Sequence, residues 1–354
     1  MEITCGKQVT QPLVHSVTYG SNIDGVYSEN YITSLEGQLM SETFHSNFCF
    51  DIDKKIVVPN LFRSDHDGAN VMNISLSSIS CFDGRRCIVA PNGEQVVLIY
   101  DEYGNEISRA FINISIYSIA GGILGHPLMI ENGTSMIYEY SNGAIRQLFW
   151  SQPLLPFDIA SLNDGRIVLV GTMNVRSLQG VDVETEGAMR IYEQNGLLCN
   201  EVAKENGEPL FKFPRQVCVN LHNNDIYVGD IRKMQVMRFR EDCTFVSLYR
   251  RREMESIDLG NGVISELIIR SSNFPLALTY SQRSHLLFAS YVSAIDRGIH
   301  VLSPGLELLG IFSSNEELGN PVGMSCDENG RLYVGDTADG IIRVFKLSQF
   351  INRL

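Results

Sequence analysis

The stretch that decides the fold lies near the C-terminus and reads PVGMSCDENGRLYVGD at residues 321–336, followed by IIRVF at 341–345. Three short runs rich in Val, Ile, Tyr and Phe are typical of β-strands. DENG at 327–330 and TADG at 337–340 separate them and are turn sequences. Because no run is long enough for a helix, the stretch predicts a small antiparallel sheet.

The same pattern occurs roughly one hundred residues upstream. PRQVCV at 214–219 is followed by IYVGD at 226–230, VMRF at 236–239 and a fourth run, TFVSLY, at 244–249. The tetrapeptide Tyr-Val-Gly-Asp is present in both copies. A four-stranded unit that recurs along a chain predicts one blade of a β-propeller.

The shared pattern resembles the NHL-repeat family of six-bladed propellers. It consists of a proline opening the first run, an Asn/Asp turn, Tyr-Val-Gly-Asp, and Arg-(apolar)-Phe in the third run. Two units carry it well and the others match in outline. The resemblance implies a rigid ring that recognises ligands through loops.

The predicted fold class is therefore all-β: a six-bladed β-propeller of four-stranded antiparallel blades in a single domain, with seven blades as the alternative. Second strands are expected near six residues: Ile88, Met129, Val168, Tyr227, Leu286 and Leu332. The predicted blades are 77–113, 114–152, 155–203, 213–252, 274–313 and 320–354. Residues 45–76 are an extra hairpin or the partial seventh blade.

The last blade has three recognisable strands before the chain stops, whereas a closed ring needs four. We therefore expect residues 1–44 to supply the closing strand. The best placement is 31–44, paired with 341–347.

The chain has 354 residues and a net charge of −13, which disfavours nucleic acid and anionic lipid as partners. We expect a monomer that binds a protein, peptide or glycan. No apolar run has membrane-spanning length. The N-terminus lacks a signal pattern, which favours the cytoplasm unless a leader has been removed.

Eight cysteines are scattered without zinc spacing. Cys81 and Cys87 flank a tight turn, so their thiols are expected to face each other across a hairpin. Reduced thiols are favoured over a disulfide because the other cysteines show no paired spacing.

In a four-stranded blade, the loops between second and third strands share a face with the loops between blades. Two long insertions, 173–187 and 251–273, fall on this face. Loops on one face of a propeller commonly carry its function. The candidate ligand-binding residues are Arg232, Lys233, Tyr291, Asp296, Arg297 and Asp339.

No catalytic motif is recognisable, and no cofactor is expected. The alternative is Ca or Zn at the central channel, which resemblance to propeller lactonases and amidating lyases would imply. Asp230 and Asp336 could be ligands, but a carboxylate recurring after a strand is better explained by capping of backbone N–H groups. His126 and His300 are the remaining metal candidates and are better explained as packed or exposed residues.

The sequence thus favours a non-enzymatic binding propeller that uses loops on one face. The alternative is a metal-dependent hydrolase or lyase of the lactonase or amidating-lyase type. The channel discriminates between them: converging acidic, Asn or His side chains favour an enzyme, and an aromatic-rich face favours a binder.

Overall fold

The computed structural model describes residues 49–57, 76–82, 86–91, 94–122, 125–176, 183–250, 257–258, 264–265, 274–292, 297–312, 318, 321–336 and 341–348. All of them belong to one compact unit, Asn47–Leu354. These residues form strands and turns, and none of them is helical.

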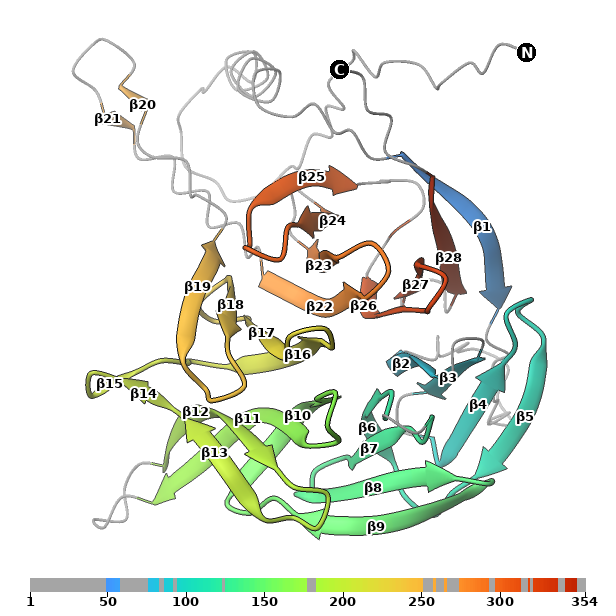
Figure 1. Ribbon diagram of the computed structural model, residues 1–354, viewed down its shortest axis with the longest axis horizontal. Coiled ribbons are helices and arrows are strands. Elements are labelled where there is room, and N and C mark those ends of the chain that lie inside the picture. The colour runs from blue at the N-terminus through green and yellow to red at the C-terminus, as the bar shows by residue number, and fades with distance from the viewer. Residues whose placement is uncertain are drawn as a thin grey trace, which may run out of the picture. The chain divides into compact units, whose positions relative to one another are not determined.

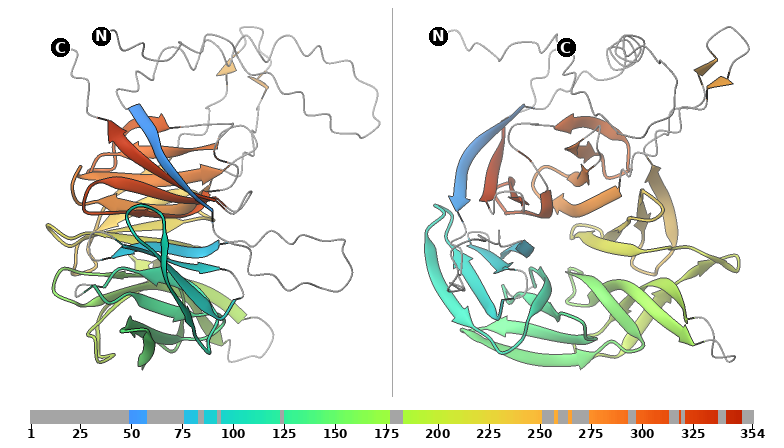
Figure 2. Two further views of the ribbon diagram at one scale, coloured as in Figure 1. Left: turned by 90° about the vertical axis from the view of Figure 1, so that its right-hand side faces the viewer. Right: turned by 180° about the vertical axis from the view of Figure 1, so that it is seen from behind.

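The described strands form six four-stranded antiparallel sheets arranged around a central axis, as Figures 1 and 2 show from three directions. The structure is therefore a six-bladed β-propeller, and the fold-class prediction is confirmed. In blades 1 to 5 the first strand lies nearest the centre and the others follow outward in chain order, whereas in blade 6 the order from the centre is β26, β27, β28 and β1.

The first three blades run without interruption along the chain. Blade 1 is β2 (Leu76–Phe82), β3 (Arg86–Pro91), β4 (Val96–Tyr100) and β5 (Glu106–Phe111). Blade 2 is β6 (Ile116–Ala120), β7 (Leu128–Glu131), β8 (Met136–Ser141) and β9 (Ala144–Trp150). Blade 3 is β10 (Leu154–Ser161), β11 (Ile167–Arg176), β12 (Val183–Tyr192) and β13 (Leu198–Val202).

Two short hairpins lie between the later blades. The first is β14 (Lys204–Glu205) with β15 (Glu208–Pro209), and the second is β20 (Ile257–Asp258) with β21 (Ile264–Ser265). Blade 4 is β16 (Pro214–Asn220), β17 (Asp225–Asp230), β18 (Gln235–Phe239) and β19 (Phe245–Arg250). Blade 5 is β22 (Phe274–Ser281), β23 (Leu286–Val292), β24 (Arg297–Leu302) and β25 (Leu308–Phe312).

Blade 6 joins the two ends of the folded unit. It consists of β26 (Pro321–Cys326), β27 (Arg331–Asp336), β28 (Ile341–Ser348) and, on the outside, β1 (Cys49–Val57). The register runs from Cys49 opposite Ser348 to Val57 opposite Ile341. An N-terminal strand therefore closes the ring.

The expected position of the closing strand, 31–44, was wrong: the partner of 341–347 is 49–57, and 31–44 lie outside the described residues. The polar stretch DIDKK at 51–55 looked like a turn between two strands. It lies within β1, where a register irregularity between Ile52 and Lys54 accommodates it. This assignment also removes the seventh blade, because β1 completes the sixth.

Apolar side chains from neighbouring sheets meet between the blades. Between blades 1 and 6, for example, Ile79 and Leu98 pack in one cluster with Val344, and all three are buried. A comparable cluster joins Val170 of blade 3 to Val228 of blade 4. The core is thus divided among the gaps between adjacent blades, and removal of these apolar side chains from water stabilises the ring.

A β-bulge recurs at the same place in all six inner strands. The register shifts lie between Leu76/Ser78, Ile116/Ser118, Pro156/Asp158, Pro214/Gln216, Pro275/Ala277 and Pro321/Gly323. Each shift leaves one residue without a cross-strand partner, and such a residue has its side chain re-aimed. The bulge thus sets one residue of each inner strand apart from the regular ladder, near one end of the strand.

The bulge explains the glycine of Tyr-Val-Gly-Asp, because this glycine sits opposite it on the second strand. Gly229 pairs with Gln216, directly after the bulge. A Cβ at Gly229 would lie 3.1 Å from Leu278 of the next blade and 3.3 Å from the Gln216 side chain. Close packing between blades therefore favours glycine here.

The aspartate of the motif caps backbone amides. The side chain of Asp230 is fully buried and accepts hydrogen bonds from the amides of Lys212 (2.6 Å), Phe213 (3.1 Å), Arg232 (3.0 Å) and Lys233 (2.9 Å). This agrees with the structural role inferred from the sequence. The corresponding Asp336 is also buried and contacts Arg343 Nη1 at 3.2 Å.

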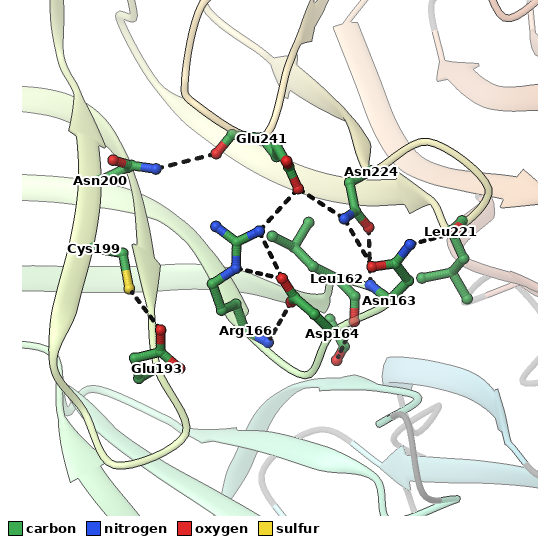
Figure 3. Close-up of polar contacts among 11 residues, drawn as sticks. Leu162, Asn163, Asp164, Arg166, Glu193, Cys199, Asn200, Leu221, Asn224 and Glu241 are labelled. Atoms are coloured by element: carbon green, nitrogen blue, oxygen red, sulfur yellow. Dashed lines mark hydrogen bonds and ion pairs between the residues drawn. The ribbon is translucent and has the colours of Figure 1, made fainter.

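A polar network links blades 3 and 4 through their first turns (Figure 3). Asn224 donates to Asn163 Oδ1 and to Glu241 Oε2, both at 2.8 Å, and accepts from the Asn163 amide at 2.9 Å. Arg166 joins the network by contacting Asp164 (2.7 Å) and Glu241 (2.9 Å). These contacts fix two adjacent blades relative to each other.

Replacement of Asn224 by alanine is expected to lower the free energy of unfolding by about 2 kcal/mol, because it removes three hydrogen bonds made by a buried side chain. Asn224 also has a positive φ of 58°, which alanine tolerates less well. Asn206→Ala is the matched control, since Asn206 has a φ of 51° in an exposed turn. Urea unfolding of both variants separates the network from the backbone effect. Equal losses would contradict a role for the network.

Candidate functional site

The centre of the ring contains a cavity of about 630 Å³. The inner strands of all six blades line it: β2, β6, β10, β16, β22 and β26. This volume lies in the range of sites for small molecules. The channel is therefore the candidate functional site.

The bulges determine which side chains stand at one end of this cavity. Five bulge residues line it: Tyr117, Phe157, Arg215, Leu276 and Val322. They occupy early positions in their strands, close to the turn between β17 and β18. This end of the channel is called the bulge rim below.

Aromatic rings and guanidinium groups gather on the bulge rim over blades 2 to 4. The ring centroids of Tyr117 and Phe157 are 6.2 Å apart, and those of Phe157 and Phe213 are 4.8 Å apart. Arg215 Cζ lies 6.0 Å from the Tyr117 centroid, and Arg232 Cζ lies 5.3 Å from the Phe213 centroid. The three aromatic residues are partly exposed. Together these five side chains form what we call the aromatic strip.

Asp158 lies next to the strip, directly after the bulge in β10. Its carboxylate accepts a hydrogen bond from the Ser118 hydroxyl of blade 2 and another, at 2.8 Å, from the Val217 amide of blade 4. Burial raises the pKa of Asp158 to about 6, against the lowering effects of these hydrogen bonds and of Arg215. Its side chain lines the cavity.

The use of aspartate here exceeds what capping requires. At the equivalent place between blades 1 and 2, Ser78 Oγ accepts the Ile119 amide at 3.0 Å. Between blades 6 and 1, Ser325 Oγ accepts the Cys81 amide at 2.8 Å. A neutral hydroxyl thus satisfies an inner-strand amide, and a carboxylate costs more to bury. Perturbed, costly ionisable groups in a cleft are candidates for function.

Tyr117 also has its pKa raised, chiefly by burial, although the neighbouring Arg215 lowers it. The phenol therefore stays protonated at neutral pH. Asp158, Arg215 and Tyr117 together supply a carboxylate, a fixed cation and a neutral hydroxyl to one part of the channel. This set can bind an anion and transfer a proton.

The residues predicted to bind ligand are distributed differently from expectation. Arg232 does stand at the rim, in the aromatic strip, and Lys233 Nζ donates to the carbonyls of Pro209 (3.0 Å) and Leu210 (2.7 Å). Tyr291 is fully buried, with its ring 4.2 Å from that of His300. Its side chain therefore packs in the core between blades 4 and 5 and is not on a loop face.

The structure does not test the remaining predicted positions. Asp296 and Asp339 lie outside the described residues, and Arg297 is described only as the first residue of β24. The insertion 173–187 is in part an extension of the β11–β12 hairpin, with Arg176 opposite Val183. Of the insertion 251–273, the structure describes only β20 and β21.

Sequence reasoning missed Tyr117, Phe157, Asp158 and Arg215, although a signal for two of them, Phe157 and Arg215, was present. In blades 3 to 6 the inner strand contains a proline, and the residue directly after it is the bulge residue, as in Pro156-Phe157 and Pro214-Arg215. The proline of the repeat therefore marks the rim position in four of the blades.

The described channel residues do not fit a metal ion. Within the part of the chain that the structure describes, no group of three or more His, Cys, Asp or Glu side chains could hold one. Both Asp158 oxygens already accept hydrogen bonds. His126 lies 3.7 Å from Glu139 of its own blade, and the buried His300 of blade 5 contacts the Tyr249 hydroxyl of blade 4 at 2.9 Å, so neither side chain points into the channel as part of a ligand set.

Cys81 and Cys87 are directly opposite each other in β2 and β3, as predicted. Both are free thiols in the structure, and burial raises the pKa of Cys87 well above its usual range. Cys81, Cys218 and Cys326 line the channel. Burial also raises the pKa values of Cys218 and Cys326, so their thiols stay protonated and poorly nucleophilic at neutral pH.

No protein-family model matches this chain, and no curated protein sequence is significantly similar to it. Solved structures are similar in fold. A gluconolactonase from Xanthomonas campestris has 14% identity and a TM-score of 0.56, over 78% of this chain and 86% of its own. A streptogramin B lyase has 12% identity and a TM-score of 0.55, over 85% and 98%.

A virginiamycin B lyase from Staphylococcus aureus has 10% identity and a TM-score of 0.55, covering 85% of this chain and all of its own. At such identities the similarity concerns the propeller fold.

Among the described residues, no helix has the length and apolar character needed to cross a membrane.

Proposed function

We propose that this protein is an enzyme of the hydrolase or lyase type that acts on a small molecule in the central channel. The observation that carries the proposal is Asp158, a carboxyl with a pKa of about 6 that lines a cavity of about 630 Å³. Similar folds carry gluconolactonase and lyase activities, which supports the enzymatic interpretation over the binding one favoured by sequence.

In this proposal Asp158 is the general base. With a pKa of about 6 it is mostly ionised at neutral pH and still basic enough to accept a proton from water or from an acidic C–H bond of the substrate. Arg215 stabilises the negative charge that develops on the substrate oxygen. Tyr117, which stays protonated, donates a hydrogen bond. No step requires a metal ion.

The test is a panel of chromogenic esters and lactones assayed with wild type and Asp158→Asn. The variant keeps the size of the side chain and is expected to lower kcat/KM at least about 100-fold. For wild type, kcat/KM is expected to fall below about pH 6, where the base is protonated. Asp242→Asn, at an exposed turn carboxylate, is the control. Turnover unaffected by Asp158→Asn, or no turnover of any compound, would contradict the proposal.

The second candidate is the non-enzymatic binding propeller. It is favoured by the aromatic strip and by the fact that both Asp158 oxygens already have hydrogen-bond partners within the protein. In that case wild type and Asp158→Asn would bind the same compounds, and neither protein would turn any of them over. The same panel, read by binding as well as by turnover, decides between the two.

Asp158 also predicts how stability depends on pH. Its folded-state pKa of about 6 is above the unfolded value of about 4, so the folded state binds the proton more tightly. This group's contribution to the unfolding free energy therefore falls as pH rises from about 4 to about 6, by up to about 2 kcal/mol, and is then constant. The Tm of Asp158→Asn minus the Tm of wild type should become more positive as pH rises through that window and stay level above it. A constant difference would contradict the raised pKa.

A further inference from the structure

We infer that the ligand of the channel is a planar aromatic or conjugated acid, recognised by the aromatic strip. This rests on the proposed function only in placing the ligand in the channel. The strip is built by three blades, since Tyr117 and Phe157 come from the bulges of β6 and β10, and Phe213 and Arg215 come from the start of blade 4.

The ring geometry favours a planar ligand. The centroid distances of 6.2 and 4.8 Å lie in the range of aromatic contacts, and the interplanar angles are 50° for Tyr117–Phe157 and 31° for Phe157–Phe213. All three rings are partly exposed, so a face or edge remains for a further ring. Phe157, the middle ring, also lines the cavity and is the central contact.

The guanidinium groups favour an acid. Among the described residues, the other buried or half-buried arginines each form a salt bridge with a carboxylate: Arg166, Arg190, Arg238, Arg331 and Arg343. Within the described residues, neither Arg215 nor Arg232 forms a salt bridge, and each lies over a ring instead. A guanidinium has five N–H donors, so contact with a neighbouring aromatic side chain leaves donors for a carboxylate.

The net charge makes this placement informative. The chain has 41 acidic and 28 basic residues, so a carboxylate partner for a surface arginine is readily available. Arg215 and Arg232 form no salt bridge within the described residues, so at the rim their positive charges are available to attract an anion.

The experiment is calorimetric titration of the full chain with three probes of similar size or charge. 2-Naphthoate is planar and anionic, 2-naphthamide is planar and neutral, and gluconate is anionic without a ring. We expect 2-naphthoate to bind at least about tenfold more tightly than either of the others, with affinity that falls as salt is raised. The inference would be overturned if 2-naphthamide or gluconate bound as tightly as 2-naphthoate, or if 2-naphthoate did not bind at millimolar concentration.

Variants locate the site. Phe157→Leu and Arg215→Gln are each expected to weaken 2-naphthoate binding about five- to tenfold, and Arg215→Lys to recover only part of the loss because the planar fork is missing. Tyr103→Leu and Arg240→Gln are the matched controls, because both residues are exposed, neither lines the cavity, and they lie in the turns between the third and fourth strands of blades 1 and 4. Unchanged affinity in both rim variants would place naphthoate elsewhere and overturn the inference.

The outcome is separable from that of the proposed function. If naphthoate binds as expected but no panel compound is turned over, the subsite stands and the enzyme proposal fails. If Asp158→Asn abolishes turnover of a substrate without a ring while naphthoate does not bind, the enzyme stands and the aromatic-acid subsite fails.

Discussion

A chain that begins at residue 58 is expected to lose cooperative folding, whereas a chain that begins at Asn47 is expected to melt like the full-length protein. The first deletion removes β1, the outer strand of blade 6, and leaves the edge of β28 unpaired from Ile341 to Ser348. Ring closure couples the first and last blades, so its loss should cost more than about 5 kcal/mol, which is most of the stability of an ordinary domain. Circular dichroism melts and size-exclusion chromatography measure the effect.

The two deletions differ in a way that identifies the cause. The shorter one leaves the unit Asn47–Leu354 intact. The longer one also exposes a strand edge, which promotes association between chains. Equal melting temperatures for the two chains would show that β1 does not close the ring.

Replacement of Asp230 by alanine is expected to lower the free energy of unfolding by about 4 kcal/mol. Its fully buried carboxylate accepts hydrogen bonds from the amides of Lys212, Phe213, Arg232 and Lys233, and alanine leaves all four unpaired. Asp230→Asn should lose about half as much, because the amide group retains one acceptor oxygen but turns a donor toward other donors. Urea unfolding gives both values.

The control for Asp230 is Asp101→Ala. Asp101 Oδ1 accepts the amides of Tyr103 (2.9 Å) and Asn105 (2.8 Å) in an exposed turn, where water replaces the lost acceptor. Its loss should therefore be much smaller. Similar losses at both positions would mean that burial of the carboxylate does not matter.

Because Asp230 also orders the segment from Phe213 to Arg232, its loss should weaken 2-naphthoate binding as well.

The sequence predicted the blades well because their determinants are local. Alternating β-formers and Asn/Asp-Gly turns specify hairpins within a few residues, so six blades and the Cys81–Cys87 pairing followed directly. The closing strand depended on a contact between residues far apart in sequence. β1 carries the polar stretch 51–55, whose local composition favours a turn, and only pairing with β28 makes it a strand.

The site was predicted less well for a related reason. Loop length drew attention to 173–187 and 251–273, whereas the channel residues lie inside strands. Phe157 and Asp158 look like ordinary members of a β-run, and their special direction comes from the bulge. The raised pKa of Asp158 depends on Ser118 and Val217 from two other blades, which sequence spacing cannot bring together.

The bulge that recurs in every inner strand has a consequence for how such a protein can change its ligand. Each inner strand has one position outside the regular ladder, and five of these residues line the channel: Tyr117, Phe157, Arg215, Leu276 and Val322. In the present chain these positions already hold aromatic, cationic and aliphatic residues on one backbone pattern. Substitutions there can alter selectivity independently of folding, so the ring offers a natural starting library for engineered recognition.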